Sequence, residues 1–139
     1  MNIKRIKVWA NLSVKDVKET HEFYKELGFK PNGAFPNEHE LASFLVGEDN
    51  FVVHFFSHKS FKPSLGGAIA DLKNGNEVMF TLSADSKEEV EEWAESVKKA
   101  GGTVFSEPQK VQDNEHWYGC GFADLDGHKW NVFYNRNAK

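Results

Sequence analysis

Two stretches of the chain repeat their apolar residues with the period of an amphipathic helix. The stretch VKDVKETHEFYKELGF, residues 14–29, does so and reaches a glycine at Gly28. The stretch SKEEVEEWAESVKKAGG, residues 86–102, does the same, and Ser86 and Glu89 have the spacing of a capping box. These patterns predict two α-helices, each ending at a glycine.

Shorter stretches of alternating apolar and polar residues predict β-strands. KVWANLSV, residues 7–14, precedes the first helix, and EVMFTLSA, residues 77–84, precedes the second. Each helix is followed by turn-rich sequence and by two more strand candidates. The last of these, at 48–56 in the first half, recurs as LDGHKWNVF at 125–133 in the second. The order predicts two βαβββ modules.

The two halves also match in spacing, which is the test for an internal repeat. Val8 and Leu12 in the first half correspond to Val78 and Leu82 in the second. We therefore expect one domain over residues 1–139, with module one at about 4–57, a polar linker at about 58–75 and module two at about 76–135.

Composition narrows the class of protein. The 139 residues suffice for one domain with a substantial core, and 40% hydrophobic with 27% charged residues is ordinary for a soluble globular protein. The single cysteine, Cys120, excludes an internal disulfide and fits a reducing cytoplasm. No apolar run approaches the roughly 20 residues that span a bilayer, and the first residues lack a signal-peptide pattern. The net charge of −4 and the scattered lysines disfavour nucleic-acid binding. We expect a cytoplasmic protein without a membrane or nucleic-acid partner.

Alternation along the strands separates two faces. One face is apolar and is expected to lie under the helices: it holds Val8, Leu12, Val53, Phe55, Val78, Phe80, Trp130 and Val132. The other face mixes large apolar with polar side chains: Trp9, Asn11, Val52, His54, Phe56, Glu77, Met79, Thr81, Asn131 and Phe133. Solvent rarely faces so many large apolar groups, and a sealed core rarely holds unpartnered polar ones. A curved sheet around a small-molecule cavity accommodates both.

Three stretches resemble the vicinal oxygen chelate superfamily: NLSVKDVKETHEFYKELGF, LSADSKEEVEEWAESVKKAGG and FADLDGHKWNVF. That superfamily includes glyoxalase I, extradiol dioxygenases, thiol-transferring fosfomycin resistance proteins and bleomycin resistance proteins. The resemblance covers roughly residues 6–134 and is strongest to small bacterial glyoxalase-like proteins. It implies an α+β fold in which two βαβββ modules form a curved mixed sheet around a cavity, with the helices outside.

The resemblance also implies where a metal would bind. Metal-dependent members place ligands on the first and last strand of each module, typically His or Gln, then Glu, His and Glu. Carried over to this chain, those positions are Trp9, His54, Glu77 and Asn131. An indole cannot ligate a metal, and a neutral amide is a poor substitute for a carboxylate. Because only His54 and Glu77 remain as good ligands, we expect neither a metal nor another cofactor.

Several candidate residues have two readings. His54 is a ligand contact or general base, or else a half-buried histidine bonded to a neighbour. Glu77 is a catalytic base in an aromatic cavity, or else a strand-start glutamate in solvent. Asn131 orients a ligand or bridges His54 and Glu77 by hydrogen bonding, or else it is a satisfied polar residue in a wet cavity. Cys120 is expected to be an inert buried thiol. The wall residues, each of which has plain packing as its alternative, are Trp9, Phe56, Met79, Trp117 and Phe133.

The sequence therefore predicts a metal-independent small-molecule-binding protein of the glyoxalase/bleomycin-resistance type. Its ligand would be aromatic or amphipathic and would contact Asn11, His54, Glu77 and Asn131. The alternative is a lyase or isomerase that acts next to a carbonyl with Glu77 as base, helped by His54, with or without a weakly bound divalent metal. A third reading is a scaffold whose cavity has no use. We expect a homodimer, because each module has sheet edges to cover.

Overall fold

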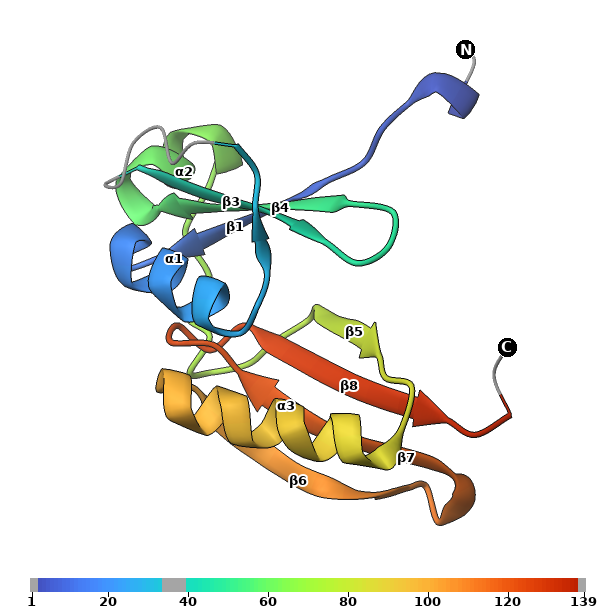
Figure 1. The fold of residues 1–139 in the computed structure, drawn as a ribbon. Helices are drawn as coiled ribbons and strands as arrows, with labels where there is room; N and C mark the ends of the chain where they lie inside the picture. Colours follow the sequence, from blue (N-terminus) through green and yellow to red (C-terminus); the bar gives the residue numbers. More distant parts are fainter. Residues whose placement is uncertain (1–2, 34–39, 138–139) are drawn as a thin grey trace. The chain divides into compact units, whose positions relative to one another are not determined.

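The chain divides into two compact units (Figure 1). The computed structural model describes residues 3–33 and 40–137. Unit 1 is Met1–Ala70 and unit 2 is Asp71–Lys139. Each unit has one βαβββ order, and unit 1 carries an additional helix after it. None of the helices in the described part of the chain combines the length and apolar character that a membrane crossing requires.

Unit 1 is a four-stranded mixed sheet in the order β1-β4-β3-β2. Strands β1 and β4 are parallel, so helix α1 lies in the crossover between the first strand and the rest of the sheet, while β3 runs antiparallel to its neighbours. The elements are η1 (Ile3–Arg5), β1 (Ala10–Val14), α1 (Val17–Glu26), β2 (Lys30–Pro31), β3 (Leu41–Val46), β4 (Phe51–Ser57) and α2 (His58–Leu65).

Unit 2 repeats this topology as β5-β8-β7-β6, again with the first and last strands parallel. In Figure 1, helix α3 lies along one face of its sheet. The elements are β5 (Met79–Ser83), α3 (Lys87–Ala100), β6 (Thr103–Val111), β7 (Asn114–Ala123) and β8 (Lys129–Asn135). The predicted α+β fold with two βαβββ modules is therefore confirmed.

The predicted start of α3 is formed by local hydrogen bonds. The Ser86 hydroxyl accepts the Glu89 backbone N–H at 3.1 Å, and the Glu89 carboxylate accepts the Asp85 N–H at 2.8 Å. The helix ends at Gly101, whose φ of 93° is left-handed. Asp16 caps α1 in a similar way, accepting the N–H of Glu19 at 3.0 Å.

Each helix packs on one face of its own sheet. In unit 1, Tyr24 of α1 stacks on Phe55 of β4 with ring centroids 4.6 Å apart. In unit 2, Trp93 of α3 stacks on Phe122 of β7 with centroids 6.2 Å apart, and Phe122 stacks in turn on Trp130 of β8. Tyr24, Phe55, Phe122 and Trp130 are all buried, so these aromatic contacts belong to the cores of the two units.

Two residues predicted to lie under the helices do not. Val8 is 74% exposed and Val78 is 56% exposed, because β1 begins only at Ala10 and β5 only at Met79. The partner of β5 is β8, and their pairing starts at Met79. Residues before Met79 do not pair with β8, although the alternating apolar pattern begins earlier in the sequence. The strand is therefore shorter than the pattern.

The predicted linker at 58–75 contains a helix that its polar composition concealed. The Ser57 hydroxyl accepts the Ser60 N–H at 3.2 Å, and Gly66 ends α2 with a left-handed φ of 72°. No residue of α2 is fully buried, so the stretch lacks a strong apolar stripe.

Cys120 is buried and its thiol lies 3.8 Å from the Val90 carbonyl oxygen of α3. Burial, with a smaller contribution from Glu107, raises the pKa of the Cys120 thiol to about 11.

We expect the Cys120 thiol of the folded protein to react slowly with Ellman's reagent at about pH 8, where the thiolate is scarce, and rapidly once urea unfolds the protein. Because the folded state holds this proton more tightly, stability should fall as pH rises above about 9. A fast reaction of the folded protein would contradict the assignment.

Candidate functional site

The face of the unit 1 sheet opposite α1 brings four predicted site residues together. His54 of β4 lies between Asn11 of β1 and Ser43 of β3 in the strand register. The rings of Trp9 and Phe56 flank the imidazole edge-on, with centroids 6.4 Å and 5.7 Å from it. On this open face the His54 imidazole therefore has polar residues beside it on the neighbouring strands and two aromatic rings in edge-on contact.

His54 lacks a partner for one of its ring nitrogens. Its Nδ1 is buried and makes no hydrogen bond to any residue in the described ranges 3–33 and 40–137. Burial lowers the pKa of the His54 imidazole below its usual value of 6.5. The ring is thus neutral near pH 7, and a neutral imidazole has one nitrogen that donates and one that accepts a hydrogen bond.

The His54 environment predicts a pH dependence. The folded state binds the His54 proton more weakly than the unfolded chain, so stability is full above about pH 6.5 and falls as pH decreases below it. In an NMR titration we expect the His54 ring signal, assigned by its loss in His54→Asn, to have a midpoint below 6.5. A midpoint above 6.5 would mean that the ring has an anionic partner instead.

Helix α2 covers one end of this open face. Phe61 of α2 contacts Phe56 of β4, with ring centroids 6.2 Å apart. Ser13 of β1 and His58 Nδ1, at the start of α2, share a hydrogen bond. His58 is therefore engaged with Ser13 and anchors α2 rather than joining His54.

The open face of the unit 2 sheet carries the other predicted wall residues. Asn131 of β8 is paired with Thr81 of β5 on one side and Gly121 of β7 on the other. Phe133 of β8 and Trp117 of β7 meet edge-on with centroids 5.9 Å apart. Met79, at the start of β5, is paired with Lys129 and is 54% exposed.

The strand register changes which residue corresponds to Trp9 in the second module. Trp9 lies two residues before Asn11, which pairs with His54. In unit 2, Met79 lies two residues before Thr81, which pairs with Asn131. Met79, not Glu77, is thus the counterpart of Trp9. The repeat itself contained this signal, because the match of Val8 with Val78 also aligns Trp9 with Met79.

Glu77 does not join this face. It precedes β5 and is exposed, so it belongs to neither face of the strand. The expectation that it points into an aromatic cavity with Asn131 assumed a strand beginning at residue 77. Its second reading, a glutamate that reaches solvent, is the one that its exposure supports.

The residues at the four metal positions do not fit a metal of the kind the family implies. With the register corrected they are Trp9, His54, Met79 and Asn131, which offer one imidazole, a thioether and an amide. Hard or borderline divalent ions prefer carboxylate and imidazole ligands, and a thioether favours soft ions. Across residues 3–33 and 40–137, no group of three His, Cys, Asp or Glu side chains is placed to hold an ion.

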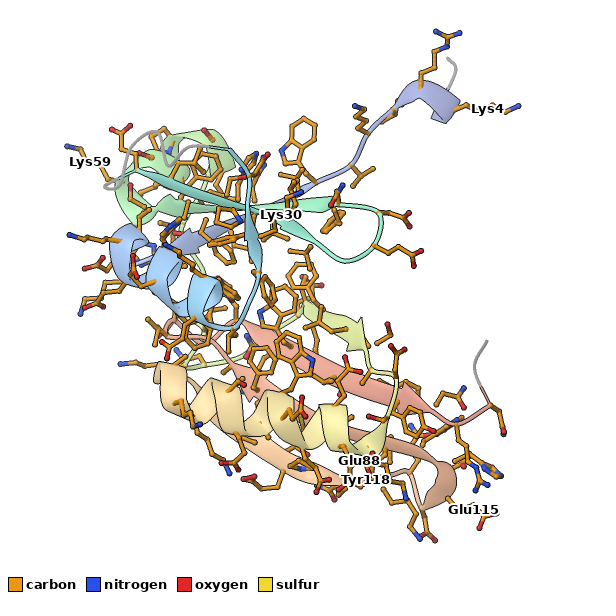
Figure 2. All side chains as sticks on the ribbon, viewed as in Figure 1. Lys4, Lys30, Lys59, Glu88, Glu115 and Tyr118 are labelled. Atoms are coloured by element: carbon orange, nitrogen blue, oxygen red, sulfur yellow. The ribbon has the colours of Figure 1, made fainter. Side chains whose placement is uncertain are left out.

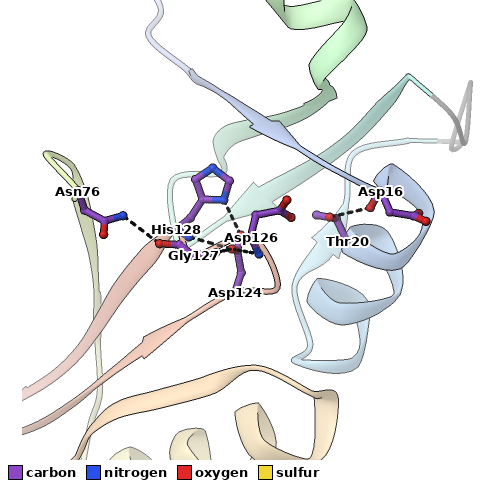
Figure 3. Close-up of polar contacts among 7 residues, drawn as sticks. All are labelled: Asp16, Thr20, Asn76, Asp124, Asp126, Gly127 and His128. Carbon is purple, nitrogen blue, oxygen red and sulfur yellow. Dashed lines mark hydrogen bonds and ion pairs between the residues drawn. The ribbon is translucent and has the colours of Figure 1, made fainter. Parts of the chain in front are cut away.

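A turn held by one buried carboxylate introduces β8 (Figure 3). Asp124 Oδ1 accepts the backbone N–H groups of Asp126, Gly127 and His128 at 2.9, 3.0 and 2.9 Å, and its Oδ2 lies 2.8 Å from His128 Nδ1. Asn76 adds a hydrogen bond to the Gly127 carbonyl at 2.9 Å. This turn fixes the start of β8 and therefore the position of Asn131 on that strand.

A separate depression lies at the end of unit 2 where α3 starts. Figure 2 shows Glu88, Tyr118 and Glu115 at this end of the unit. The depression has a volume of about 250 Å³, and it is lined by Ser86, Lys87, Glu88, Glu115, Tyr134 and Arg136. None of these residues was predicted as a site residue. They combine two cations with two carboxylates in a largely exposed setting, which is typical of an ordinary polar surface.

Comparison with known proteins identifies the family. The sequence model described as the glyoxalase/bleomycin resistance protein/dioxygenase superfamily matches residues 6–132. The chain belongs to this superfamily. No curated protein matches it in sequence. This match confirms the family resemblance that the helix and turn motifs indicated.

Several solved structures share the fold. A hypothetical protein from S. aureus is 34% identical, with a TM-score of 0.80 over 96% of this chain and 99% of that one. A glyoxalase-related enzyme from Fulvimarina pelagi is 22% identical, with a TM-score of 0.77 over 93% and 88%. A fosfomycin resistance protein from Listeria monocytogenes is 18% identical, with a TM-score of 0.66 over 96% and 94%. Proteins described with different functions share this fold, so structural similarity alone does not assign an activity.

Proposed function

We propose that this chain is a metal-independent small-molecule-binding protein of the glyoxalase/bleomycin-resistance type. The observation that carries the proposal is the set of residues at the metal positions, Trp9, His54, Met79 and Asn131, only one of which is a good ligand for a divalent ion. They stand among half-buried aromatic side chains on open sheet faces, a make-up that suits an aromatic or amphipathic ligand.

Metal analysis tests this proposal most directly. Protein purified without chelator should contain far less than one transition metal per chain by inductively coupled plasma analysis, and divalent metals should not raise its melting temperature. A thermal-shift screen of aromatic compounds should give hits. About one zinc, nickel or iron per chain, lost in His54→Ala, would overturn the proposal. His58→Ala serves as the matched control, because it removes a histidine that is bonded to Ser13.

The alternative is a lyase or isomerase acting next to a carbonyl. This reading assigns Glu77 as the catalytic base. The exposed position of Glu77 before β5 argues against that assignment. The observation that keeps this alternative is His54, whose neutral ring has an unpartnered Nδ1 within the described residues and could accept a proton. Turnover of an α-hydroxycarbonyl compound that is lost in His54→Gln but retained in Glu77→Gln would favour the enzyme.

A cytoplasmic homodimer remains our proposal for location and assembly. The edge strands of the two sheets are β1 and β2 in unit 1 and β5 and β6 in unit 2, and exposed edges favour pairing. Light scattering at tens of micromolar protein should give twice the mass of the chain. A monomer at that concentration would contradict it.

A further inference from the structure

The centre of the open face of unit 2 has one ionisable side chain. Three strands, β5, β8 and β7, meet there in three rows of paired residues. The rows are Met79, Lys129 and Ala123; Thr81, Asn131 and Gly121; and Ser83, Phe133 and Gly119. Of these nine residues only Lys129 carries a charge near pH 7, so this part of the face has a single positive centre.

Phe105 holds this lysine in place. Phe105 lies on β6 at a shift in the pairing of β6 with β7, between Val104 and Ser106. Its ring lies over Gly121, where an added Cβ would come within 2.5 Å of the ring carbon Cζ. The Lys129 Nζ stands 4.1 Å from the centroid of the same ring, a cation–π distance.

The ammonium group has no anionic partner in the described chain. Among residues 3–33 and 40–137, Lys129 forms no ion pair, and the contact with Phe105 leaves its N–H donors available. Asn131 lies two residues along the same face, about 7 Å away at the strand rise, and its amide can donate a hydrogen bond. Phe133 lies two residues beyond Asn131 on the same face, and its ring contacts Trp117 of β7.

We propose that the open face of unit 2 recognises an aromatic carboxylate, with Lys129 as the cation that binds the carboxylate. Asn131 donates to the same group, and the aromatic part of the ligand extends along the strand to Phe133, whose ring Trp117 contacts. Phe105 is a positioning residue, because it orients the Lys129 ammonium without needing to touch the carboxylate. One cation matches the single negative charge of a carboxylate. This inference rests on the proposed small-molecule-binding function and names the chemical class of the ligand.

The test compares two probes of the same shape, 2-naphthoate and its neutral analogue 2-naphthamide, by calorimetry at low salt. The unmodified protein should bind the naphthoate at least about tenfold more tightly. Lys129→Met should reduce this ratio to about one, and Lys129→Arg should retain most of it. Phe105→Leu should lower the ratio in part. The control Lys110→Met, which removes an exposed lysine paired with Asp113, should leave it unchanged.

NMR places the probe on the molecule. Naphthoate should shift the backbone amide signals of Gly119 and Gly121 in the unmodified protein and not in Lys129→Met. Equal binding of the two probes, or a preference that survives Lys129→Met, would overturn the inference. Failure of both probes to bind at millimolar concentration would overturn it too. In each case the metal content and the wider aromatic screen would still decide the proposed function separately.

Discussion

Trp130→Ala is expected to lower the free energy of unfolding by about 4 kcal/mol, the largest effect of any single change considered. Trp130 is 1% exposed and contacts Phe80 and Phe122 on the α3 side of the unit 2 sheet. Its removal leaves a cavity that the surrounding rings cannot fill, because the strands on either side fix their positions. Urea denaturation followed by circular dichroism measures the loss.

Trp117→Ala is the matched control for this prediction. It removes the same type of side chain from the same sheet, but from the open face, where Trp117 is only half-buried beside Phe133. We expect it to cost less than about 2 kcal/mol. Equal losses in the two variants would contradict the assignment of the two faces, and with it the candidate ligand surface.

Asp124→Ala should lower the free energy of unfolding by about 3 kcal/mol. The Asp124 side chain is 1% exposed and accepts three backbone N–H groups in addition to its contact with His128. Without the carboxylate these donors lose their partner in a place that water reaches poorly. Asp124→Asn should cost less, since its amide oxygen can still accept from the backbone.

Asp113→Ala provides the comparison for the turn. Its carboxylate is 95% exposed and lies 3.2 Å from Lys110 Nζ, so its removal should change the free energy of unfolding by less than about 0.5 kcal/mol. The two aspartates thus separate a buried carboxylate that organises a turn from a surface ion pair. A loss in Asp124→Ala as small as that in Asp113→Ala would show that the turn forms without the side chain.

The sequence predicted the repeated modules, both long helices and much of the core. The capping residues of α3 and the glycine that ends it act within a few positions, so their effect can be read locally. The strand residues Val53, Phe55, Trp130 and Val132 were assigned to the buried face, and all are buried. Alternation predicted them because both neighbours of β4 and of β8 continue the ladder.

The same alternation failed at the edges. Val8, Val78 and Glu77 fit the strand pattern but precede the first paired residue of β1 or β5. Periodicity cannot say where a strand begins, because that depends on where the partner strand starts. For β5 the start coincides with that of β8, which follows the turn held by Asp124.

What the sequence determined by itself was therefore the topology of the modules, which follows from residue types and their spacing; the absence of a metal, inferred from Trp9 and Asn131 at positions that the family resemblance implies, stays a prediction. Only the tertiary structure decided that Glu77 lies before the first paired residue of β5, and that Phe105 of β6 meets Lys129 of β8 across the intervening β7. The physical reason is that such a contact depends on strand order and on a shift in pairing next to Gly121, where the missing side chain leaves room for the ring. Neither is encoded in the local alternation of apolar and polar residues.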